Sequence, residues 1–594
     1  MPAFGKVLVA NRGEIAVRVF RTLRELGIGT VAVYSEADRA SVHAALADEA
    51  YLVGPGPAAE SYLDQERVIE VALRARAEAV HPGYGFLAEN ASFARACTDA
   101  GLVWIGPPPE AIEVMGSKVA ARELMRNAGV PVVPGTTEPV ASAAEVARLG
   151  EEFGWPLAIK ASAGGGGKGL KVVEGPDEVE RALAAARREG EAYFADATVY
   201  VEKFIHDPRH VEVQVLADDH GTVLHLGERD CTIQRRHQKL VEETPSPAVT
   251  AELRDRIGRI AVDAARAVGY RSAGTIEGLL DRAGNYWFLE MNTRIQVEHT
   301  VTELVTGVDL VREQVLIAAG EPTGVKQEEL RFRGHAIECR INAEDPANGF
   351  LPAPGMLTRY REPAGPGVRV DSGVVEGSEI SGLYDPLVAK LCVWDSDRER
   401  ARARMLRALD EFEIEGVKTL VGFHKALLRR PCFAAGETCH GVVESDELAE
   451  EAEQLSHETT TVPRAADGQL RDRVLSVEVD DRRFEVRVLA PEPPFAELAR
   501  RRRERGPGGR GQAAAKHAVV SPMQGTVLAV EVAEGDDVRA GQVICVVEAM
   551  KMENEIVAHR EGRVDALSVA VGEPVKTGQV ICVVVQEGGT EDAV

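Results

Sequence analysis

The chain has 594 residues, of which 45% are hydrophobic, and it carries a formal net charge of −25. This length predicts about four domains, and the apolar content is typical of packed globular cores and excludes a disordered or fibrous chain. The acidic balance excludes binding to duplex nucleic acid or to a membrane surface, since both need broad basic faces.

The amino terminus, MPAFGKVLVANRGE, lacks the apolar core of a signal peptide, and no segment approaches the roughly 18 to 20 apolar residues of a membrane span. We therefore expect a cytoplasmic protein. Eight cysteines are scattered along the chain without a C-x-x-C pair, at positions 97, 231, 339, 392, 432, 439, 545 and 582. This spacing predicts reduced thiols rather than a disulfide or zinc framework.

The first third alternates short apolar runs with helical stretches. KVLVA, EIAVRVFRTLRELG and GTVAVYS, within residues 6–35, predict a strand, an amphipathic helix and a strand of a parallel βαβ unit. A second cycle ends in EAVHPGYGFLAEN and GLVWIGPPP, and hairpins and helices follow from about residue 131.

A glycine-rich segment, IKASAGGGGKGLKVV, covers residues 159–173 between two apolar runs that read as strands. Glycines let backbone amides approach phosphates, and Lys160 and Lys168 add positive charge. The pattern is not that of a Walker loop, because no G-K-[ST] follows. Nucleotide binding and an ordinary hairpin loop both fit this segment.

A hairpin is predicted in GTIEGLLDRAGNYWFLEMNTRIQVEH, residues 274–299, with its turn at Ala283-Gly284. Residues whose numbers sum to 567 then face each other, which places Glu277 opposite Glu290. Opposed carboxylates destabilise a bare sheet, whereas a hard cation such as Mg²⁺ between them removes the penalty.

The residues that follow continue this pattern. Polar residues take the even positions from Glu290 to Glu298, and apolar residues take odd ones, which predicts a strand with one polar face. That face could simply be solvated. Carboxylate, amide and guanidinium groups in series beside the opposed pair favour a binding site instead.

From about residue 447 the composition becomes polar and rich in breakers, with a lone hairpin predicted over 473–489 and a linker over 490–517. We interpret the basic run Arg500 to Arg503 as a solvated linker or docking helix rather than a polyanion site. A flexible segment 491–518 would span roughly 30 Å, which would let the following domain reach two sites.

The last part of the chain contains an internal repeat. AEGDDVRAGQVICVV from Ala533 matches AVGEPVKTGQVICVV from Ala570, an offset of 37 residues. The repeat predicts two β-rich halves related by a pseudo-two-fold axis and joined by a hairpin at EAMKMENE. Lys551 lies at its tip between Met550 and Met552. It could be an ordinary surface lysine, but two exposed methionines favour a role other than stability.

EAMKMEN on a repeated β domain resembles the biotinyl carrier domain of biotin-dependent carboxylases, which implies biotin attached to Lys551. The segments ANRGEIAVRVFRTLRELGI, HPGYGFLAENASFA, EKFIHDPRHVEVQV, ERDCTIQRRHQKLVEE and ECRINAEDP resemble the biotin carboxylase family of ATP-grasp enzymes. This second match is nearly continuous over residues 3–446.

The resemblance implies a multidomain α/β and α+β fold. It is expected to comprise a parallel α/β amino-terminal domain (1–114), an ATP-grasp domain (115–330), a biotin carboxylase carboxy-terminal domain (331–446), a linker with a short hairpin for partner docking (447–516) and an all-β biotinyl or lipoyl-type carrier domain (517–587).

The same resemblance implies site residues at matching positions. ATP would be held by Lys118, Lys160, Gly166, Gly167, Glu202, Lys203, Ile205, His210, Gln234, His237, Glu277 and Glu290. Mg²⁺ or Mn²⁺ would be held by Glu277, Glu290 and Asn292. Bicarbonate would be surrounded by Lys239, Arg294, Gln296, Val297 and Glu298, and biotin would meet Arg340.

The family chemistry gives these residues roles. Glu298 would act as general base while Arg294 and Lys239 hold bicarbonate for attack on ATP, giving carboxyphosphate. After this collapses to CO₂ and phosphate, phosphate would deprotonate biotin, and Arg340 would stabilise the anion that then captures CO₂. The glycine lid at 164–167 would exclude water.

The resemblance also implies partners. A biotin protein ligase would modify Lys551, and a separate carboxyltransferase β subunit would transfer the carboxyl group to acetyl-CoA or propionyl-CoA within a hetero-oligomer that contains a homo-oligomer of this chain. A methylcrotonyl-CoA or other branched acyl-CoA carboxylase is the alternative. A lipoyl-type carrier fused to an unrelated ligase, and an inactive scaffold, are the other hypotheses.

Three residues depart from the family pattern. Gly278 stands where a bulky aromatic is expected, Thr300 replaces proline in EHPVTE, and Ala163 replaces a glycine. None removes a charged or metal-binding group, so they bear on rate and adenine packing rather than on the type of reaction.

Overall fold

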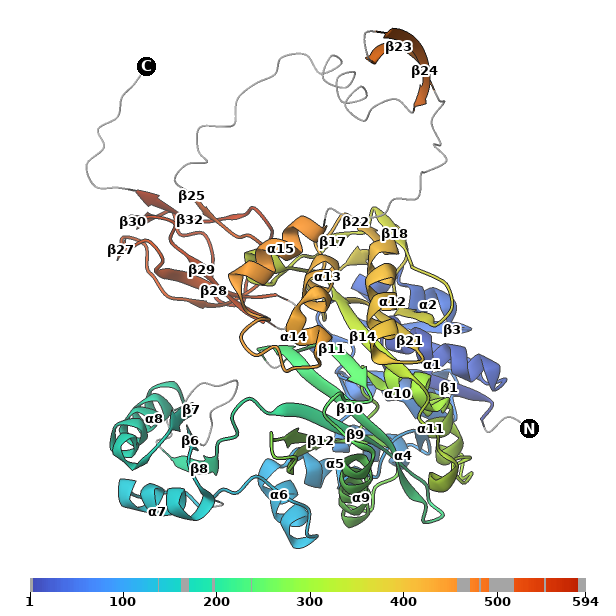
Figure 1. Ribbon diagram of the computed structural model, residues 1–594, viewed down its shortest axis with the longest axis vertical. Helices are drawn as coiled ribbons and strands as arrows, with labels where there is room; N and C mark the ends of the chain where they lie inside the picture. The colour runs from blue at the N-terminus through green and yellow to red at the C-terminus, as the bar shows by residue number, and fades with distance from the viewer. Residues whose placement is uncertain are drawn as a thin grey trace. The chain divides into compact units, whose positions relative to one another are not determined.

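The computed structural model describes residues 4–136, 138–161, 170–194, 198–236, 238–456, 471–479, 482–490, 518–549 and 552–585. It divides into two compact units, residues 1–458 and 459–594 (Figure 1).

The amino-terminal part is a five-stranded parallel sheet in the order β3-β2-β1-β4-β5, with helices on both faces. Because successive strand residues point to opposite faces, Val7 and Val9 pack in one core with α1, and Leu8 packs in the other with α3 and α4. The βαβ unit predicted within residues 6–35 is confirmed. The elements are β1 (Lys6–Val9), α1 (Gly13–Glu25), β2 (Gly29–Ser35), α2 (Val42–Leu46), β3 (Glu49–Gly54), α3 (Gln65–Arg74), β4 (Ala79–His81), α4 (Ala91–Asp99), β5 (Val103–Trp104) and α5 (Pro109–Gly116).

A small antiparallel sheet, β7-β6-β8, follows and has its own core with α7 and α8 (Figure 1). Lys160 on β6 pairs with Leu170 on β7, so two strands flank the glycine-rich segment as predicted. Residues 162–169 themselves, with Gly166 and Gly167, lie outside the described residues. The elements are α6 (Lys118–Asn127), α7 (Ala143–Phe153), β6 (Leu157–Ala161), β7 (Leu170–Val173), α8 (Val179–Phe194) and β8 (Val199–Lys203).

The largest sheet has eight antiparallel strands in the order β13-β12-β9-β10-β11-β14-β21-β19. The β11 to β14 pairing, with Val241 opposite Cys339, joins segments far apart in the sequence into one continuous surface. Its elements are β9 (Arg209–Ala217), β10 (Val223–Arg235), β11 (Gln238–Thr244), α9 (Ala251–Ala267), β12 (Ser272–Leu280), β13 (Tyr286–Asn292), α10 (His299–Thr306), α11 (Leu310–Ala318), β14 (His335–Asn342), β19 (Val368–Ser372) and β21 (Leu387–Asp395).

Short strands and four helices complete the first unit. The strands pair as β15 with β16, β17 with β20, and β18 with β22. The elements are β15 (Glu344–Asp345), β16 (Leu351–Pro352), β17 (Gly355–Met356), β18 (Arg359–Arg361), β20 (Glu379–Ile380), α12 (Arg398–Glu411), β22 (Glu413–Glu415), α13 (Val421–Arg429), α14 (Pro431–Ala434) and α15 (Asp446–Ser456).

One cysteine prediction is wrong. Cys432 and Cys439 form a disulfide with their Cα atoms 5.4 Å apart, while the other six cysteines are free and buried. The chain reverses between them at Gly436, which has φ +73°, and this brings the two side chains within bonding range. The two cysteines are seven residues apart and form neither a C-x-x-C pair nor part of a regular framework, so the linear spacing did not indicate the pairing.

The second unit contains the predicted lone hairpin and the carrier domain. The hairpin consists of β23 (Arg471–Val479) paired with β24 (Arg482–Ala490). The carrier has two four-stranded sheets, β25-β32-β30-β27 and β29-β28-β26-β31, around one apolar core. Its strands are β25 (Ala518–Val520), β26 (Gly525–Val530), β27 (Asp537–Val538), β28 (Val543–Ala549), β29 (Met552–Val557), β30 (Gly562–Asp565), β31 (Pro574–Val575) and β32 (Val580–Val585).

The predicted repeat of the carrier is confirmed strand by strand. An offset of 37 residues relates β26 to β30, β27 to β31 and β28 to β32, and each sheet takes strands from both halves. A Cβ at Gly525 would lie 2.2 Å from the carbonyl oxygen of Glu548, and one at Gly562 would lie 2.6 Å from that of Val585, so both halves need glycine at the same place. Lys551 falls between β28 and β29, outside the described residues.

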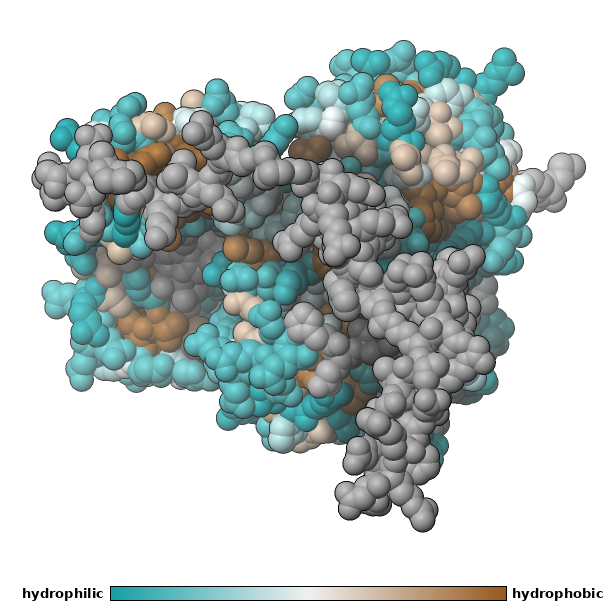
Figure 2. All heavy atoms as spheres, turned by 90° about the horizontal axis from the view of Figure 1, so that it is seen from above, coloured by the Kyte–Doolittle hydropathy of each residue, from teal (hydrophilic) through white to brown (hydrophobic). Residues whose placement is uncertain are grey.

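None of the helices in the described part of the chain is long and apolar enough to cross a membrane. On the face seen in Figure 2, hydrophilic residues predominate among the described atoms, and hydrophobic residues form separate smaller patches.

Candidate active site on the central sheet

The predicted hairpin places Glu277 on β12 directly opposite Glu290 on β13, as expected. The predicted turn is wrong in detail. The loop runs from Asp281 to Asn285, closed by a 3.0 Å hydrogen bond from the Asp281 amide to the Asn285 carbonyl, and Leu280 pairs with Tyr286. An irregularity between Glu277 and Gly278 leaves Leu289 as an extra residue and restores the pairing of the two carboxylates.

The strand predicted through residue 298 ends at Asn292. Residues 293–298 form an irregular segment, and α10 begins at His299. The polar residues still converge, because the Asn292 and Gln296 amides donate to Glu277 Oε1 at 2.6 and 2.7 Å. Arg294 joins them by donating to Gln296 Oε1 at 2.7 Å and to Asn292 Oδ1 at 3.1 Å.

Lys239 on β11 lies at the centre of three carboxylates. Its Nζ is 2.5 Å from Glu212, 2.9 Å from Glu277 and 2.7 Å from Glu298. Burial alone would lower the pKa of Lys239, but Glu212 and Glu298 outweigh it and hold the pKa well above its usual value. The ammonium is therefore charged at neutral pH.

Glu298 is fully buried and accepts hydrogen bonds from two cations, Lys239 at 2.7 Å and Arg340 Nη2 at 2.8 Å. Burial would raise the pKa of this carboxyl, but Lys239 and Arg340 hold it well below its usual range. Arg340 on β14 also donates to Glu242 at 2.6 Å. An ionised carboxylate thus stands between a lysine and an arginine. Lys239 also bonds to Glu277, which accepts from Gln296, the partner of Arg294.

Residues of the small sheet form a second polar group. Lys160 on β6 and Arg122 on α6 both pair with Glu202 on β8, and Lys203 donates to the Trp155 carbonyl at 2.9 Å. Although burial acts to raise the pKa of Glu202, Lys160 and Arg122 lower it. Ile205 follows β8 directly.

His210 and Gln234 lie next to residues of the central cluster. His210 Nε2 lies 2.7 Å from Glu277 Oε2, and Gln234 on β10 is the register partner of Lys239. His237 and the side chain of Lys118 lie outside the described residues.

Several polar residues of the cluster were not singled out from the sequence. Glu212 on β9 is the register partner of Glu277, so carboxylates from three neighbouring strands stand in one row. Arg229 is fully buried and donates to Glu212 at 2.5 Å, and Glu89 holds Arg294 Nε at 2.9 Å. The alternation of His210, Glu212 and Gln214 with valines in HVEVQV was the signal that could have revealed Glu212.

The donor set suits a hard divalent cation. Glu277, Glu290 and Asn292 offer carboxylate and amide oxygens at the end of one hairpin, which are ligands that Mg²⁺ and Mn²⁺ prefer. His210, Glu212 and Glu277 also bring one ligand atom each within 4.8 Å of one another.

Four family descriptions match the sequence: "Biotin carboxylase, N-terminal domain" over residues 3–112, "Carbamoyl-phosphate synthase L chain, ATP binding domain" over 117–325, "Biotin carboxylase C-terminal domain" over 338–445 and "Biotin-requiring enzyme" over 517–584. The chain belongs to the biotin carboxylase family. It is a biotin carboxylase joined to a biotin carrier domain, and thus part of a biotin-dependent carboxylase.

Relatives of this biotin carboxylase serve different acceptors. It is 45% identical over 562 residues to the "Biotin-dependent acyl-coenzyme A carboxylase alpha3 subunit" of Mycobacterium leprae, covering 93% of this chain and 94% of the relative. It is 54% identical over 434 residues to a pyruvate carboxylase subunit of Methanothermobacter thermautotrophicus, covering 73% of this chain and 88% of the relative.

A solved relative is the biotin carboxylase domain dimer of Hydrogenobacter thermophilus 2-oxoglutarate carboxylase, in complex with MgADP, ADP and bicarbonate. The TM-score is 0.67 at 48% identity, covering 76% of this chain and 98% of the relative. This match confirms the predicted fold of the carboxylase half.

The two substituted positions near the site have structural explanations. A Cβ at Gly278 would lie 2.3 Å from Cζ of Tyr286, so an aromatic ring from the opposite strand fills the space where the family pattern has a bulky side chain. The Thr300 hydroxyl donates to the buried carboxylate of Glu338 and lies 3.2 Å from Cys392 Sγ. Both departures are therefore accommodated within the core behind the site.

Proposed function

We propose that this chain carboxylates a biotin attached to its own Lys551, using ATP and bicarbonate through carboxyphosphate, and that a separate carboxyltransferase subunit passes the carboxyl group to acetyl-CoA or propionyl-CoA. The observation that carries this proposal is the ionised, fully buried Glu298 held between Lys239 and Arg340. The joined carrier domain supports it.

Bicarbonate fits this cluster of side chains because the cluster already contains the cations that would bind an anion. Lys239 and Arg294 each pair with carboxylate or amide oxygens that an incoming anion would replace. As bicarbonate draws on Lys239, less positive charge acts on Glu298, so its pKa rises and it becomes a better base for the bicarbonate proton. Gln296 and the backbone of Val297 complete the proposed pocket.

ATP is proposed to lie between the small sheet and the central sheet. Lys160, Glu202, Lys203 and Ile205 come from the small sheet, and His210, Gln234, Glu277 and Glu290 come from the central one. Lys118, Gly166, Gly167 and His237 extend this proposal outside the described residues. Mg²⁺ or Mn²⁺, held by Glu277, Glu290 and Asn292, would offset charge on the phosphate oxygens.

Arg340 is the proposed contact for biotin. Its guanidinium spans Glu242 and Glu298, so it can stabilise an anionic oxygen beside the base. Burial, opposed by Arg340, raises the pKa of Glu242 to about 8, so Glu242 can remain neutral there and leave the positive charge of Arg340 available.

The carboxylase chemistry is tested by ADP release with and without bicarbonate in the wild type, Glu298→Gln and Glu243→Gln. Glu243 is a matched control, because it is buried on the same sheet but pairs with His335 and Arg398 away from the cluster. Glu298→Gln is expected to lower kcat by at least about 100-fold, with Glu243→Gln near wild type. ATP turnover that ignores bicarbonate, or that survives Glu298→Gln, would contradict the proposal.

Biotin attachment is tested by avidin blotting of the wild type, Lys551→Ala and Lys576→Ala after expression with a biotin protein ligase. Lys576 is a control lysine that follows β31 in the same domain. Signal in the wild type and Lys576→Ala but not in Lys551→Ala is expected. An unchanged signal in Lys551→Ala would overturn the assignment.

The acceptor is proposed from the Mycobacterium leprae relative, whose similarity extends over the carrier as well as the carboxylase. A co-purified carboxyltransferase partner should carboxylate acetyl-CoA or propionyl-CoA faster than methylcrotonyl-CoA, pyruvate or 2-oxoglutarate. The dimer of the Hydrogenobacter thermophilus relative supports a homodimer of this chain, which light scattering would measure. A preference for pyruvate would instead favour the acceptor of the other relative.

A further inference from the structure

Lys390 on β21 is a buried lysine that the proposed chemistry does not use. Its side chain has no solvent exposure, and Nζ donates to the carbonyl oxygen of Val297 at 2.9 Å. The same ammonium lies 3.2 Å from Glu14 Oε1 and 3.8 Å from Asp371 Oδ2. Burial alone would lower the pKa of Lys390, but Glu14 and Asp371 outweigh it, so the group stays charged.

The register of the sheet explains why this lysine needs those carboxylates. Lys390 lies directly opposite Arg340, and two cations facing each other across neighbouring strands repel. Arg340 is balanced by the ionised Glu298 and also donates to Glu242. Lys390 must therefore find its counter-charges elsewhere. Asp371 already accepts two bonds from Arg369, at 2.9 and 2.7 Å. Glu14 is therefore the nearest carboxylate partner of Lys390.

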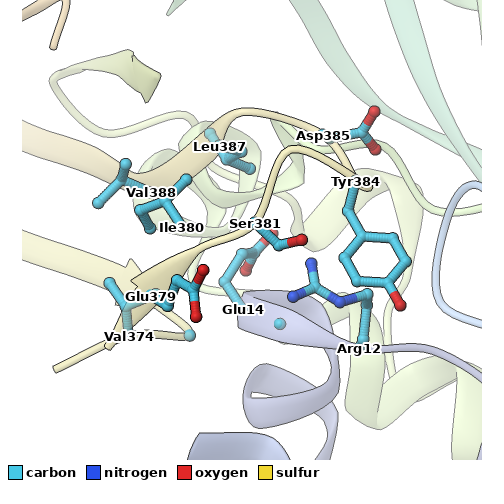
Figure 3. A pocket seen from close by; sticks show the side chains of 12 residues that line it. Arg12, Glu14, Val374, Glu379, Ile380, Ser381, Tyr384, Asp385, Leu387 and Val388 are labelled. Atoms are coloured by element: carbon cyan, nitrogen blue, oxygen red, sulfur yellow. The ribbon is translucent and has the colours of Figure 1, made fainter. Parts of the chain in front are cut away.

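Glu14 belongs to α1 of the amino-terminal part, and its side chain reaches Lys390 on the central sheet. It lines a small pocket of about 40 Å³ with Arg12 and Tyr384, and Figure 3 labels all three side chains there. Tyr84 donates to Glu14 Oε1, while Oε2 is buried without a hydrogen-bond partner among the described residues. Within the described part of the chain, Lys390 is the cation that forms an ion pair with Glu14.

The segment that carries Glu298 is fixed to the sheet at three successive places. Lys390 holds the Val297 carbonyl, Arg340 holds the Glu298 carboxylate, and Thr300 donates to Glu338. Residues 293–298 have no strand or helix pairing of their own to fix them. Their placement therefore depends on side-chain contacts, these three together with those of Gln296 and Lys239, and on backbone bonds from His299 and Val301.

We propose that Lys390, held by Glu14, is a positioning residue that fixes the Val297 carbonyl and thereby sets where Glu298 meets bicarbonate. The inference rests on the proposed function of Glu298. Loss of the ammonium removes the bond to the Val297 carbonyl and lets the segment shift, and displacements near 1 Å at a reacting group cost roughly 100-fold in rate. The effect should fall on bicarbonate rather than on ATP, because Lys390 contacts Val297, Glu14 and Asp371, none of which belongs to the proposed ATP site.

The test compares full-length wild type, Lys390→Met, Glu14→Gln and Lys425→Met by steady-state ADP release, varying ATP and bicarbonate separately. Lys425 is the matched control, a buried lysine on α13 that pairs with Asp410 at 2.9 Å. Lys390→Met should lower kcat/KM for bicarbonate at least about 10-fold with KM for ATP within about twofold of wild type. Glu14→Gln keeps the shape of the side chain. It should lower kcat/KM for bicarbonate less than Lys390→Met does, again with little change in KM for ATP. Lys425→Met should change neither kcat/KM for bicarbonate nor KM for ATP.

Other outcomes overturn the inference in distinguishable ways. If Lys390→Met does not fold, Glu14→Gln alone decides, and a wild-type kcat/KM for bicarbonate in that variant refutes the positioning role. Equal losses for ATP and bicarbonate in both variants would show a general structural role and also refute it. Absence of bicarbonate-dependent turnover in the wild type would instead refute the proposed function, and the inference with it.

Discussion

At the scale of single residues, the environment of each buried carboxylate decides its charge. Glu298 is ionised because two cations touch it. Among the described residues, Glu344, buried on β15, accepts a 3.3 Å hydrogen bond from Asn342 and has a more distant Arg235 as its cation. Burial therefore dominates there and raises the pKa of Glu344 to about 7. The first carboxylate suits catalysis, and the second makes stability depend on pH.

The pH dependence of Glu344 has a definite sign. Its folded pKa is raised above the unfolded value, so its contribution to stability is complete below about pH 4.5 and is lost as pH rises through about 7. Glu344→Gln, which cannot ionise, should therefore raise the free energy of unfolding at pH 8.5 by up to about 3 kcal/mol and change it little at pH 4.5. Urea midpoints of both proteins at the two pH values measure this. An equal difference at both would contradict the raised pKa.

At the scale of elements, local irregularities place the functional groups. The extra residue Leu289 restores the pairing of Glu277 with Glu290 after a five-residue loop. The Cys432 to Cys439 loop contacts residues that are more than 200 positions earlier in the chain. Thr438 within it donates to Asp207 at 2.8 Å, and Arg209 donates to the Gly436 carbonyl. The loop thus anchors the chain just before His210, which contacts Glu277.

Removal of this disulfide should therefore lower stability. It closes a short loop, for which the loss of unfolded-state entropy corresponds to about 2 to 3 kcal/mol. Cys432→Ser should lower the thermal midpoint of the first unit, and a dithiol reductant should lower the wild-type midpoint to the same level. Because the variant has no disulfide to reduce, reductant should not affect it. A wild-type midpoint that is insensitive to reductant would contradict this assignment.

At the scale of the whole molecule, the chain comprises two units with separate cores. The first extends to residue 458, and the carrier in the second has a core built from both halves of its repeat. No core cluster found among the described residues includes residues of both units, so we expect the two units to unfold independently. Separate cores suit the expectation, drawn from the length of segment 491–518, that the carrier can reach two sites.

Calorimetry of the full chain should therefore show two thermal transitions. Truncation after residue 456 should remove one and leave the midpoint of the other unchanged within about 2 °C, since a lost interface worth about 2 kcal/mol would shift the midpoint of a unit of this size by about that much. A single cooperative transition, or a large shift on truncation, would show instead that the units stabilise each other.

Local patterns in the sequence were enough to predict the parallel amino-terminal sheet, the carrier repeat, the opposed Glu277 and Glu290, and the motifs that place the chain in its family. These features depend on local periodicity, on internal repetition or on short motifs, which a linear pattern records. Parity also identified the polar residues from Glu290 to Glu298, although the strand predicted for the last six does not form.

The folded arrangement was needed to bring Arg229, Lys390 and Glu14 around or behind the site, and to join Cys432 to Cys439. Glu14 lies on α1 in the amino-terminal part and Lys390 on β21 of the central sheet, and the two are far apart in the chain. Their pairing depends on how β21 docks between β14 and β19 and how α1 packs against β19. A buried charge is stable only where a partner of opposite charge is brought to it, and that meeting is a property of the packed molecule rather than of either segment.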